Sequence, residues 1–206
     1  MKKIIILLLF FFMTTAQSKT IASPPYFPFN IHSKWKYKSN LGVVTVSIKA
    51  TDDDKIIKRV FKGLASYIEF YSWDDKGIYC LKKEIRNKTY TYFPRTLSYK
   101  YPLTNGKTWE YLGAETSGKK KVHSSLKAYV EGEETITVPA GKFLCKKIRF
   151  EYHDEKGTEF IYHQWLNKDV GMIQTLGKIK GKGVFGAFAR LGGGKFMYKL
   201  MEYTIK

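Results

Sequence analysis

Two cysteines and four histidines are the side chains of this chain best suited to chemistry. A cysteine nucleophile needs a base that removes its proton, so Cys145 with His153 or His163 would be the candidate pair for thiol catalysis. No signature of a cysteine-enzyme family surrounds Cys145, and no G-x-S-x-G elbow marks a nucleophilic serine. We therefore assign no catalytic residue and expect a protein that is not an enzyme, with a hydrolase of envelope polymers as the weaker alternative.

The spacing of the polar residues does not indicate a metal or cofactor site. The four histidines are His32, His123, His153 and His163. No two of them are two or four residues apart, the spacings that would place two imidazoles on one face. The acidic residues 52–54 lack the spacing of a calcium loop, and Ile57 stands where that loop needs glycine. Residues 106–108 (Gly-Lys-Thr) imitate the end of a phosphate-binding loop whose first glycine is missing.

An export signal precedes the part of the chain that is expected to fold. Lys2 and Lys3 are followed by ten apolar residues, 4–13, and then by small residues at 14–16, which together are typical of a secretory signal peptide. A membrane-spanning helix needs about 20 apolar residues, so the run is too short to be an anchor. We expect residues 1–16 to be cleaved and residues 17–206 to form one domain. This domain would be soluble in the periplasm or outside a Gram-negative cell, and would not span the membrane.

Export would expose both cysteines to an oxidising compartment. Cys80 and Cys145 follow the predicted cleavage point, so one disulfide between them is permitted. The sequence does not show whether the two are close, and the pairing is left open. Neither cysteine directly follows the cleavage point, so a lipid anchor is not expected.

The chain is strongly basic, and lysine carries most of the charge. Its formal net charge is +18, which becomes +16 when Lys2 and Lys3 are removed. Arginine occurs only at positions 59, 86, 95, 149 and 190. Recognition of phosphate and bases favours the bidentate fork of arginine, so we expect no nucleic-acid partner. Scattered lysines could instead attract an anionic envelope surface, although solubility alone is the simpler explanation.

Alternating apolar and polar residues predict an all-β fold. Val44, Val46, Ile48 and Ala50 would share one face of a strand. Similar runs recur to the end of the chain, and helical periodicity is not sustained. The chain has 15 tyrosines, 14 phenylalanines and 4 tryptophans, residue types that favour strands. We expect an antiparallel meander that forms a half-barrel, a barrel or a sandwich, with the glycine-rich stretch 177–194 as a loop or a bulged strand.

Two matched segments suggest an internal duplication. Trp35 and its flanking aromatics recur at Trp109, an offset of 74 residues. Phe70 and the following acidic-Lys-Gly turn recur at Phe150, an offset of 80 residues, and each turn contains a glycine suited to positive φ. The copies would span about 27–98 and 101–206. We expect Trp35 to superpose on Trp109 and Phe70 on Phe150.

The second half of the chain resembles a family of uncharacterised exported β-rich proteins of Gram-negative bacteria. The resemblance rests on P-A-G-x-F-x-C at 139–145 and on W-x-x-x-x-V-G-x-I at 165–173, and it covers about residues 99–205. The family is similar, at a distance, to the half-barrel lipoprotein carriers LolA and LolB. The resemblance implies an envelope protein with a concave apolar face and implies no catalytic residue.

Two functions of different classes follow from these observations. The aromatic surplus favours a module that binds a lipid or another apolar ligand on the inner face of a curved sheet. The basic surface favours a structural or assembly component that adheres to an anionic envelope surface or a protein. Whether the aromatic face is an open pocket or a closed core decides the first hypothesis.

Overall fold

The computed structural model describes residues 23–64, 66–181 and 193–206, and its described residues contain twelve strands. The strands are β1 (Lys34–Ser39), β2 (Gly42–Ala50), β3 (Ile57–Lys62), β4 (Tyr67–Trp73), β5 (Gly77–Ile85), β6 (Lys88–Lys100), β7 (Thr108–Ser117), β8 (Lys120–Val138), β9 (Gly141–Asp154), β10 (Glu159–Asn167), β11 (Gly171–Lys180) and β12 (Lys195–Thr204). The predicted signal peptide, 1–16, and most of the glycine-rich stretch, 177–194, lie outside the described residues.

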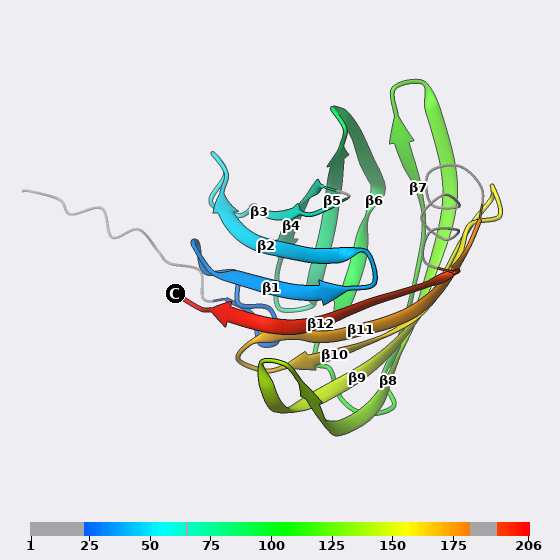
Figure 1. The fold of residues 1–206 in the computed structure, drawn as a ribbon. Coiled ribbons are helices and arrows are strands. Elements are labelled where there is room, and N and C mark those ends of the chain that lie inside the picture. Colours follow the sequence, from blue (N-terminus) through cyan, green and yellow to red (C-terminus); the bar gives the residue numbers. More distant parts are fainter. Residues whose placement is uncertain (1–22, 65, 182–192) are drawn as a thin grey trace, which may run out of the picture.

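The strands form a closed antiparallel barrel in which each strand pairs with its neighbours in the chain (Figure 1). The barrel closes where β1 pairs with β12, from Lys34 opposite Thr204 to Ser39 opposite Tyr198. The all-β antiparallel fold expected from the sequence is therefore confirmed, and of the three expected architectures it is the barrel. Among the described residues, the structure has no helix of the length and hydropathy needed to cross a membrane.

The predicted alternation places the core along β1 and β2. Trp35 and Tyr37 on β1 are buried, and Val46 and Ile48 on β2 are 0% and 2% exposed. Val44 is only half-buried and Ala50 is exposed, because these two residues lie near the ends of β2. The two-residue period of a strand thus turns one face of the sheet inward, as the sequence predicted.

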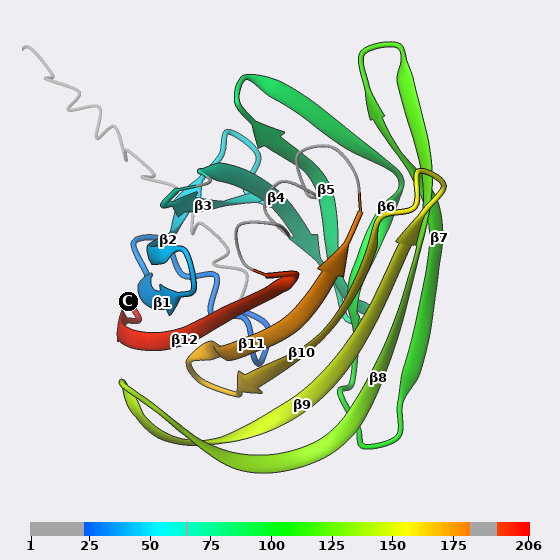
Figure 2. The ribbon, with the colours of Figure 1, turned by 45° about the vertical axis from the view of Figure 1, so that its right-hand side comes forward.

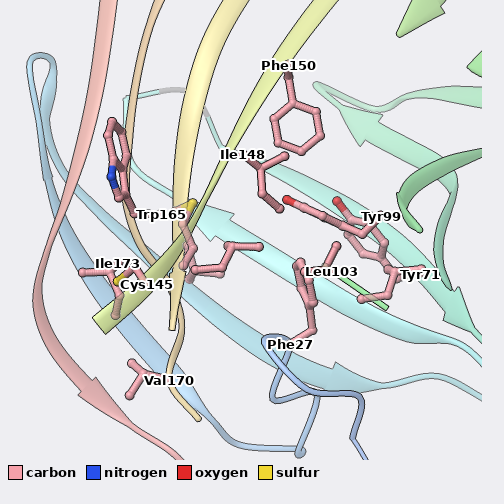
Figure 3. Close-up of a cluster of buried hydrophobic side chains, with 14 of the residues drawn as sticks. Phe27, Tyr71, Tyr99, Leu103, Cys145, Ile148, Phe150, Trp165, Val170 and Ile173 are labelled. Atoms are coloured by element: carbon pink, nitrogen blue, oxygen red, sulfur yellow. The ribbon is translucent and has the colours of Figure 1, made fainter. Parts of the chain in front are cut away.

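One end of the barrel is plugged by aromatic side chains from outside the strands. Residues 23–33 and the loop 101–107 lie at this end, where β1 begins and β6 ends. The Phe27 ring lies 4.2 Å from that of Tyr99, and Phe29 lies 5.1 Å from Trp73 and 5.9 Å from Tyr71. Figure 3 shows Phe27 and Tyr99 beside Leu103. We call this the plugged end, and the opposite end, with the β3–β4 and β5–β6 turns, the hairpin end.

The β8–β9 hairpin extends past the plugged end and bends toward β12 (Figure 2). Its tip carries the signature residues 139–145, and Ala140 N–H donates to the carbonyl of Leu200 at 3.1 Å. Phe143 packs edge-on against Tyr203 with ring centroids 6.1 Å apart. The signature residues of the hairpin therefore have a structural role, because they attach it to the last strand.

The two copies predicted from the sequence do not share a strand order. Trp35 and Trp109 each lie at the second position of a strand, β1 and β7. Two strands separate β1 from β4, which carries Phe70, whereas only β8 separates β7 from β9, which carries Phe150. Phe150 belongs to the core, while Phe70 lies between the ammonium groups of Lys58 and Lys82. The duplication stays a prediction about the sequence, since the 19-residue β8 spans a stretch that two strands occupy in the first copy.

Candidate ligand site in the barrel interior

Three charged side chains lie in a row on the inner face of the barrel. Arg59 on β3 is directly opposite Glu69 on β4, and Glu69 is directly opposite Lys83 on β5. Opposite residues of antiparallel strands project to the same face. That face is the inner one, because Ile57 and Phe61, two residues either side of Arg59, are buried in the core. We call Arg59, Glu69 and Lys83 the interior charged row.

Glu69 is the centre of the row. The Lys83 ammonium lies 3.4 Å from Glu69 Oε1, and the Tyr71 hydroxyl donates to Glu69 Oε2 at 2.8 Å. The side chains of Lys83 and Glu69 are 24% and 12% exposed, compared with 2% or less for core residues such as Ile48. The inner wall is therefore not completely filled at this level.

The two cations of the row remain charged despite their enclosure. Burial lowers the pKa of Arg59, but Tyr71, Tyr37 and Glu69 outweigh it and raise that pKa above its usual value. Burial likewise lowers the pKa of Lys83, but Glu69, Tyr67 and other neighbours together outweigh it, so that this pKa is also raised. A carboxylate beside a buried cation favours its charged form. The row therefore holds two positive charges.

Tyrosines surround the row. Tyr37, Tyr71 and Tyr99 are buried, and the latter two lie toward the plugged end beside Phe29 and Phe27. Five more are half-buried and face the interior or its rim, and these are Tyr67, Tyr92, Tyr152, Tyr162 and Tyr198. Burial raises the pKa of every one of these phenols, to about 12 for Tyr152. All eight are therefore neutral near pH 7 and can donate a hydrogen bond.

A hollow of about 560 Å³ lies at the rim of the hairpin end, where its lining includes the outward residues Val60, Ile68 and Glu84 as well as inward ones. It lies by the β3–β4 and β5–β6 turns, and Phe61 and Tyr67 are among the residues that line it. These two rings stack with centroids 4.2 Å apart. The Arg59 guanidinium lies 4.9 Å from the Phe61 centroid, and the Lys83 ammonium lies 5.3 Å from that of Tyr67. The stacked rings thus connect the hollow with the interior charged row.

Glu115 on β7 adds a second carboxyl group to the interior. It lies opposite Tyr92 of β6. The pairing between β6 and β7 is short, because it joins only residues 91–93 to residues 114–116. Burial is the main cause that raises the pKa of Glu115, and Lys83 opposes the shift. Among the described residues, the weakest pairing of the barrel wall therefore lies beside a polar part of its lining.

The structure does not bring together the residues considered for thiol chemistry. His153 lies eight residues from Cys145 on the same strand, β9, a separation of about 26 Å along a strand. His163 lies on β10 and contacts Glu131 at 3.3 Å. Burial raises the pKa of the Cys145 thiol to about 12 and raises that of Cys80 as well, so neither thiol is a thiolate near pH 7. The described residues contain no group of three or more His, Cys, Asp or Glu side chains placed to hold a metal.

The two cysteines occupy separate parts of the core. Cys80 on β5 lies beside the interior charged row, and Cys145 on β9 lies near Glu134. Both thiols are free and buried, and β6, β7 and β8 stand between their strands in the sheet. The disulfide between Cys80 and Cys145 stays a prediction from the export signal.

The sequence analysis did not identify the interior charged row. Arg59, Glu69 and Lys83 are residue types that are common on protein surfaces, so their identity alone does not mark them as interior. A usable signal was present in Ile57-x-Arg59-x-Phe61 and in Tyr67-x-Glu69-x-Tyr71. In both, a charge occupies the apolar face of a strand.

Comparison with known proteins found that part of this barrel is similar to one family model. Residues 88–178 match the DUF3108-like family model. The matched region runs from β6 into β11 and contains the signature residues 139–145 and 165–173. The match covers less than half of the chain, and the similarity is limited to this region. The comparison with curated proteins found no match.

Three solved structures are similar in fold. A predicted lipoprotein from Parabacteroides distasonis is 14% identical over 88% of this chain and 99% of that chain, with a TM-score of 0.47. The hypothetical lipoprotein YmcC from Escherichia coli is 15% identical over 85% of this chain and 86% of that chain, also with a TM-score of 0.47. A predicted exported protein with a YmcC-like fold from Bacteroides fragilis is 10% identical over 88% and 99%, with a TM-score of 0.40.

Proposed function

We propose that this protein is a non-enzymatic binding protein of the cell envelope that holds a lipid in its barrel. The observation that carries the proposal is the inner wall, which is dry and aromatic at the plugged end and only half-buried around the interior charged row. A barrel that served only as a scaffold would fill this level with apolar side chains, because enclosed charges cost stability unless they are paired. The predicted export signal supports the location in the envelope.

The half-buried aromatic side chains account for the apolar part of the ligand. Tyr162 stacks on the core residue Phe150 with ring centroids 4.9 Å apart, and Tyr198 meets Tyr37 edge-on at 6.4 Å. Each keeps part of its surface uncovered. Covering apolar surface is worth about 25 cal/mol per Å², or about 0.8 kcal/mol for each buried CH₂ group. An acyl chain laid against these rings would therefore bind through many small contributions.

We expect the mature protein, residues 17–206, to bind the neutral fluorophore N-phenyl-1-naphthylamine with saturation and to release it when a long-chain lipid is added. Tyr198→Ala removes an interior ring and should weaken lipid binding about 2- to 10-fold, the range for a single aromatic contact. Tyr129→Ala is the matched control, because Tyr129 is on the outer face of the barrel, opposite Arg149 on β9. The Arg149 guanidinium lies 5.8 Å from the Tyr129 ring. The fluorescence titration checks both, and a folded protein that does not bind the fluorophore would contradict the proposal.

An envelope component that adheres to an anionic surface is the second candidate. The outer face of β3–β6 favours it. Phe70 is flanked by the ammonium groups of Lys58 at 5.8 Å and Lys82 at 4.0 Å, and the guanidinium of Arg95 stacks over the Tyr79 ring at 3.7 Å. Adhesion of this kind should be lost as salt rises above about 0.1 M, where the screening length falls to about 10 Å. Co-sedimentation with vesicles containing phosphatidylglycerol, compared at low and high salt, checks it. Binding that is independent of salt would rule out this candidate.

A further inference from the structure

We propose that the interior charged row binds the carboxylate head of the lipid, which makes the ligand a monoanionic, fatty-acid-type amphiphile. This inference rests on the proposed function, because it names the class of ligand for the same barrel interior. It begins from the charge count of the row, which is two cations, Arg59 and Lys83, against one carboxylate, Glu69.

Of the two cations in the row, Arg59 is the one that forms no ion pair among the described residues, although Glu69 lies opposite it on β4. Among the residues that the structure describes, Glu69 pairs with Lys83 at 3.4 Å, and Arg59 takes part in no ion pair within 4.0 Å. Its guanidinium is in contact with the Tyr37 hydroxyl and lies over the Phe61 ring. Neither neighbour carries a negative charge near pH 7. An enclosed guanidinium with five donors in a planar fork is suited to a carboxylate, which accepts two parallel hydrogen bonds.

The environment of Arg59 defines how the ligand would lie. On the side of the plugged end the interior is filled, with Ile57 buried and Tyr71 and Tyr99 packed against Phe29 and Phe27. On the side of the hairpin end, Phe61 and Tyr67 are the next inward residues of β3 and β4, and both reach the rim hollow, which the outward Val60 and Ile68 also line. The carboxylate would therefore enter first and stop at Arg59, with the chain along the aromatic wall toward the hairpin end.

Glu69 makes the row selective for a single negative charge. Its carboxylate lies in the same row as the cations, so a second charge on the head group would be repelled at short range. A fatty acid meets this condition, whereas a phosphate monoester carries up to two charges near pH 7. The row is therefore expected to favour a carboxylate over a phosphate monoester with the same chain.

The test is displacement of N-phenyl-1-naphthylamine from the mature protein by palmitate, monopalmitoylglycerol, hexadecyl phosphate and the chain-free anions acetate and inorganic phosphate. We expect palmitate to bind at least about 10-fold more tightly than the uncharged glycerol ester, the size of one charged hydrogen-bond pair. Hexadecyl phosphate should bind less tightly than palmitate, and the chain-free anions should not compete. Equal affinities for palmitate and the ester would overturn the head-group assignment and leave lipid binding intact, whereas displacement by neither would overturn the proposed function as well.

Variants of the row and of its outward neighbours separate a head-group site from a structural role. Arg59→Met and Lys83→Met should each lower the affinity for palmitate about 10-fold or more. The affinity for the glycerol ester should change by less than about twofold. The matched controls are Lys58→Met and Lys82→Met, each of which removes an adjacent charge on the outer face. Both should leave the affinity for palmitate unchanged. Glu69→Gln should strengthen palmitate binding, a gain that misfolding cannot produce. Should Arg59→Met fail to fold, Lys83→Met and Glu69→Gln still decide the assignment, and loss of preference for palmitate in the controls would contradict it.

Discussion

Replacing Phe150 with alanine is expected to destabilise the barrel by about 3–5 kcal/mol, the usual cost of removing a large aromatic side chain from a core. Phe150 is 1% exposed, and its ring lies 4.9 Å from Tyr162, 5.6 Å from Tyr99 and 6.0 Å from Trp109. Its removal would open a void that touches strands from both halves of the chain. The free energy of unfolding from urea denaturation measures the loss.

The control for Phe150 is Phe93, which is 77% exposed on β6. Phe93→Ala removes the same ring from a position where it covers little of the core, so the expected change is within about 0.5 kcal/mol. A loss of similar size at both positions would show that the ring packing seen around Phe150 does not determine stability. If the slope of the unfolding free energy against urea concentration changes as well as the midpoint of the transition, the unfolding is no longer two-state.

The second large effect is expected at Gly77, the first residue of β5 after the β4–β5 turn. A Cβ atom there would lie 2.2 Å from the carbonyl oxygen of Tyr99 and 2.8 Å from Leu97 Cδ1, so the backbone of β6 would have to move. Gly77→Ala should therefore cost about 3 kcal/mol, at the upper end of the range for overpacking. Urea denaturation again measures the change.

Gly157 is the matched position in the turn between β9 and β10. Its φ is +79°, and a Cβ atom there would meet no atom within 4 Å. Gly157→Ala should cost only about 1–2 kcal/mol, the penalty of the left-handed conformation for a residue with a Cβ atom. The two substitutions change the unfolded chain in the same way, so the difference between them reports the contact with β6. Equal losses would contradict this explanation.

These two glycines show how far a sequence pattern predicts local structure. The acidic-Lys-Gly tripeptide predicted a hairpin turn at both places, and both turns are present, since Asp74 and Asp154 each accept hydrogen bonds from the following backbone amides. The pattern also suggested positive φ for both glycines, and only Gly157 has it. Gly77 is required for a different reason, the close approach of β6, which the sequence of the turn does not contain.

The sequence by itself determined the class of fold and two of the hairpin turns. The alternation in β2 depends on local geometry, because successive side chains of a strand project to opposite faces. Turn residues act locally as well, so that the two acidic-Lys-Gly tripeptides predicted the β4–β5 and β9–β10 connections. Aromatic and β-branched residues favour strands throughout, and the structure confirms the antiparallel all-β fold.

Only the tertiary structure decided which side chains meet. Closure of the barrel depends on the pairing of β1 with β12, whose partners Trp35 and Tyr203 are 168 residues apart in the chain. The candidate site depends on the register of β3, β4 and β5, because a shift of one residue would turn one member of the charged row to the outer face. Each residue of that row is charged and, taken alone, fits an exposed position equally well. Their meeting inside the barrel is a property of the strand pairing, and local sequence patterns do not encode it.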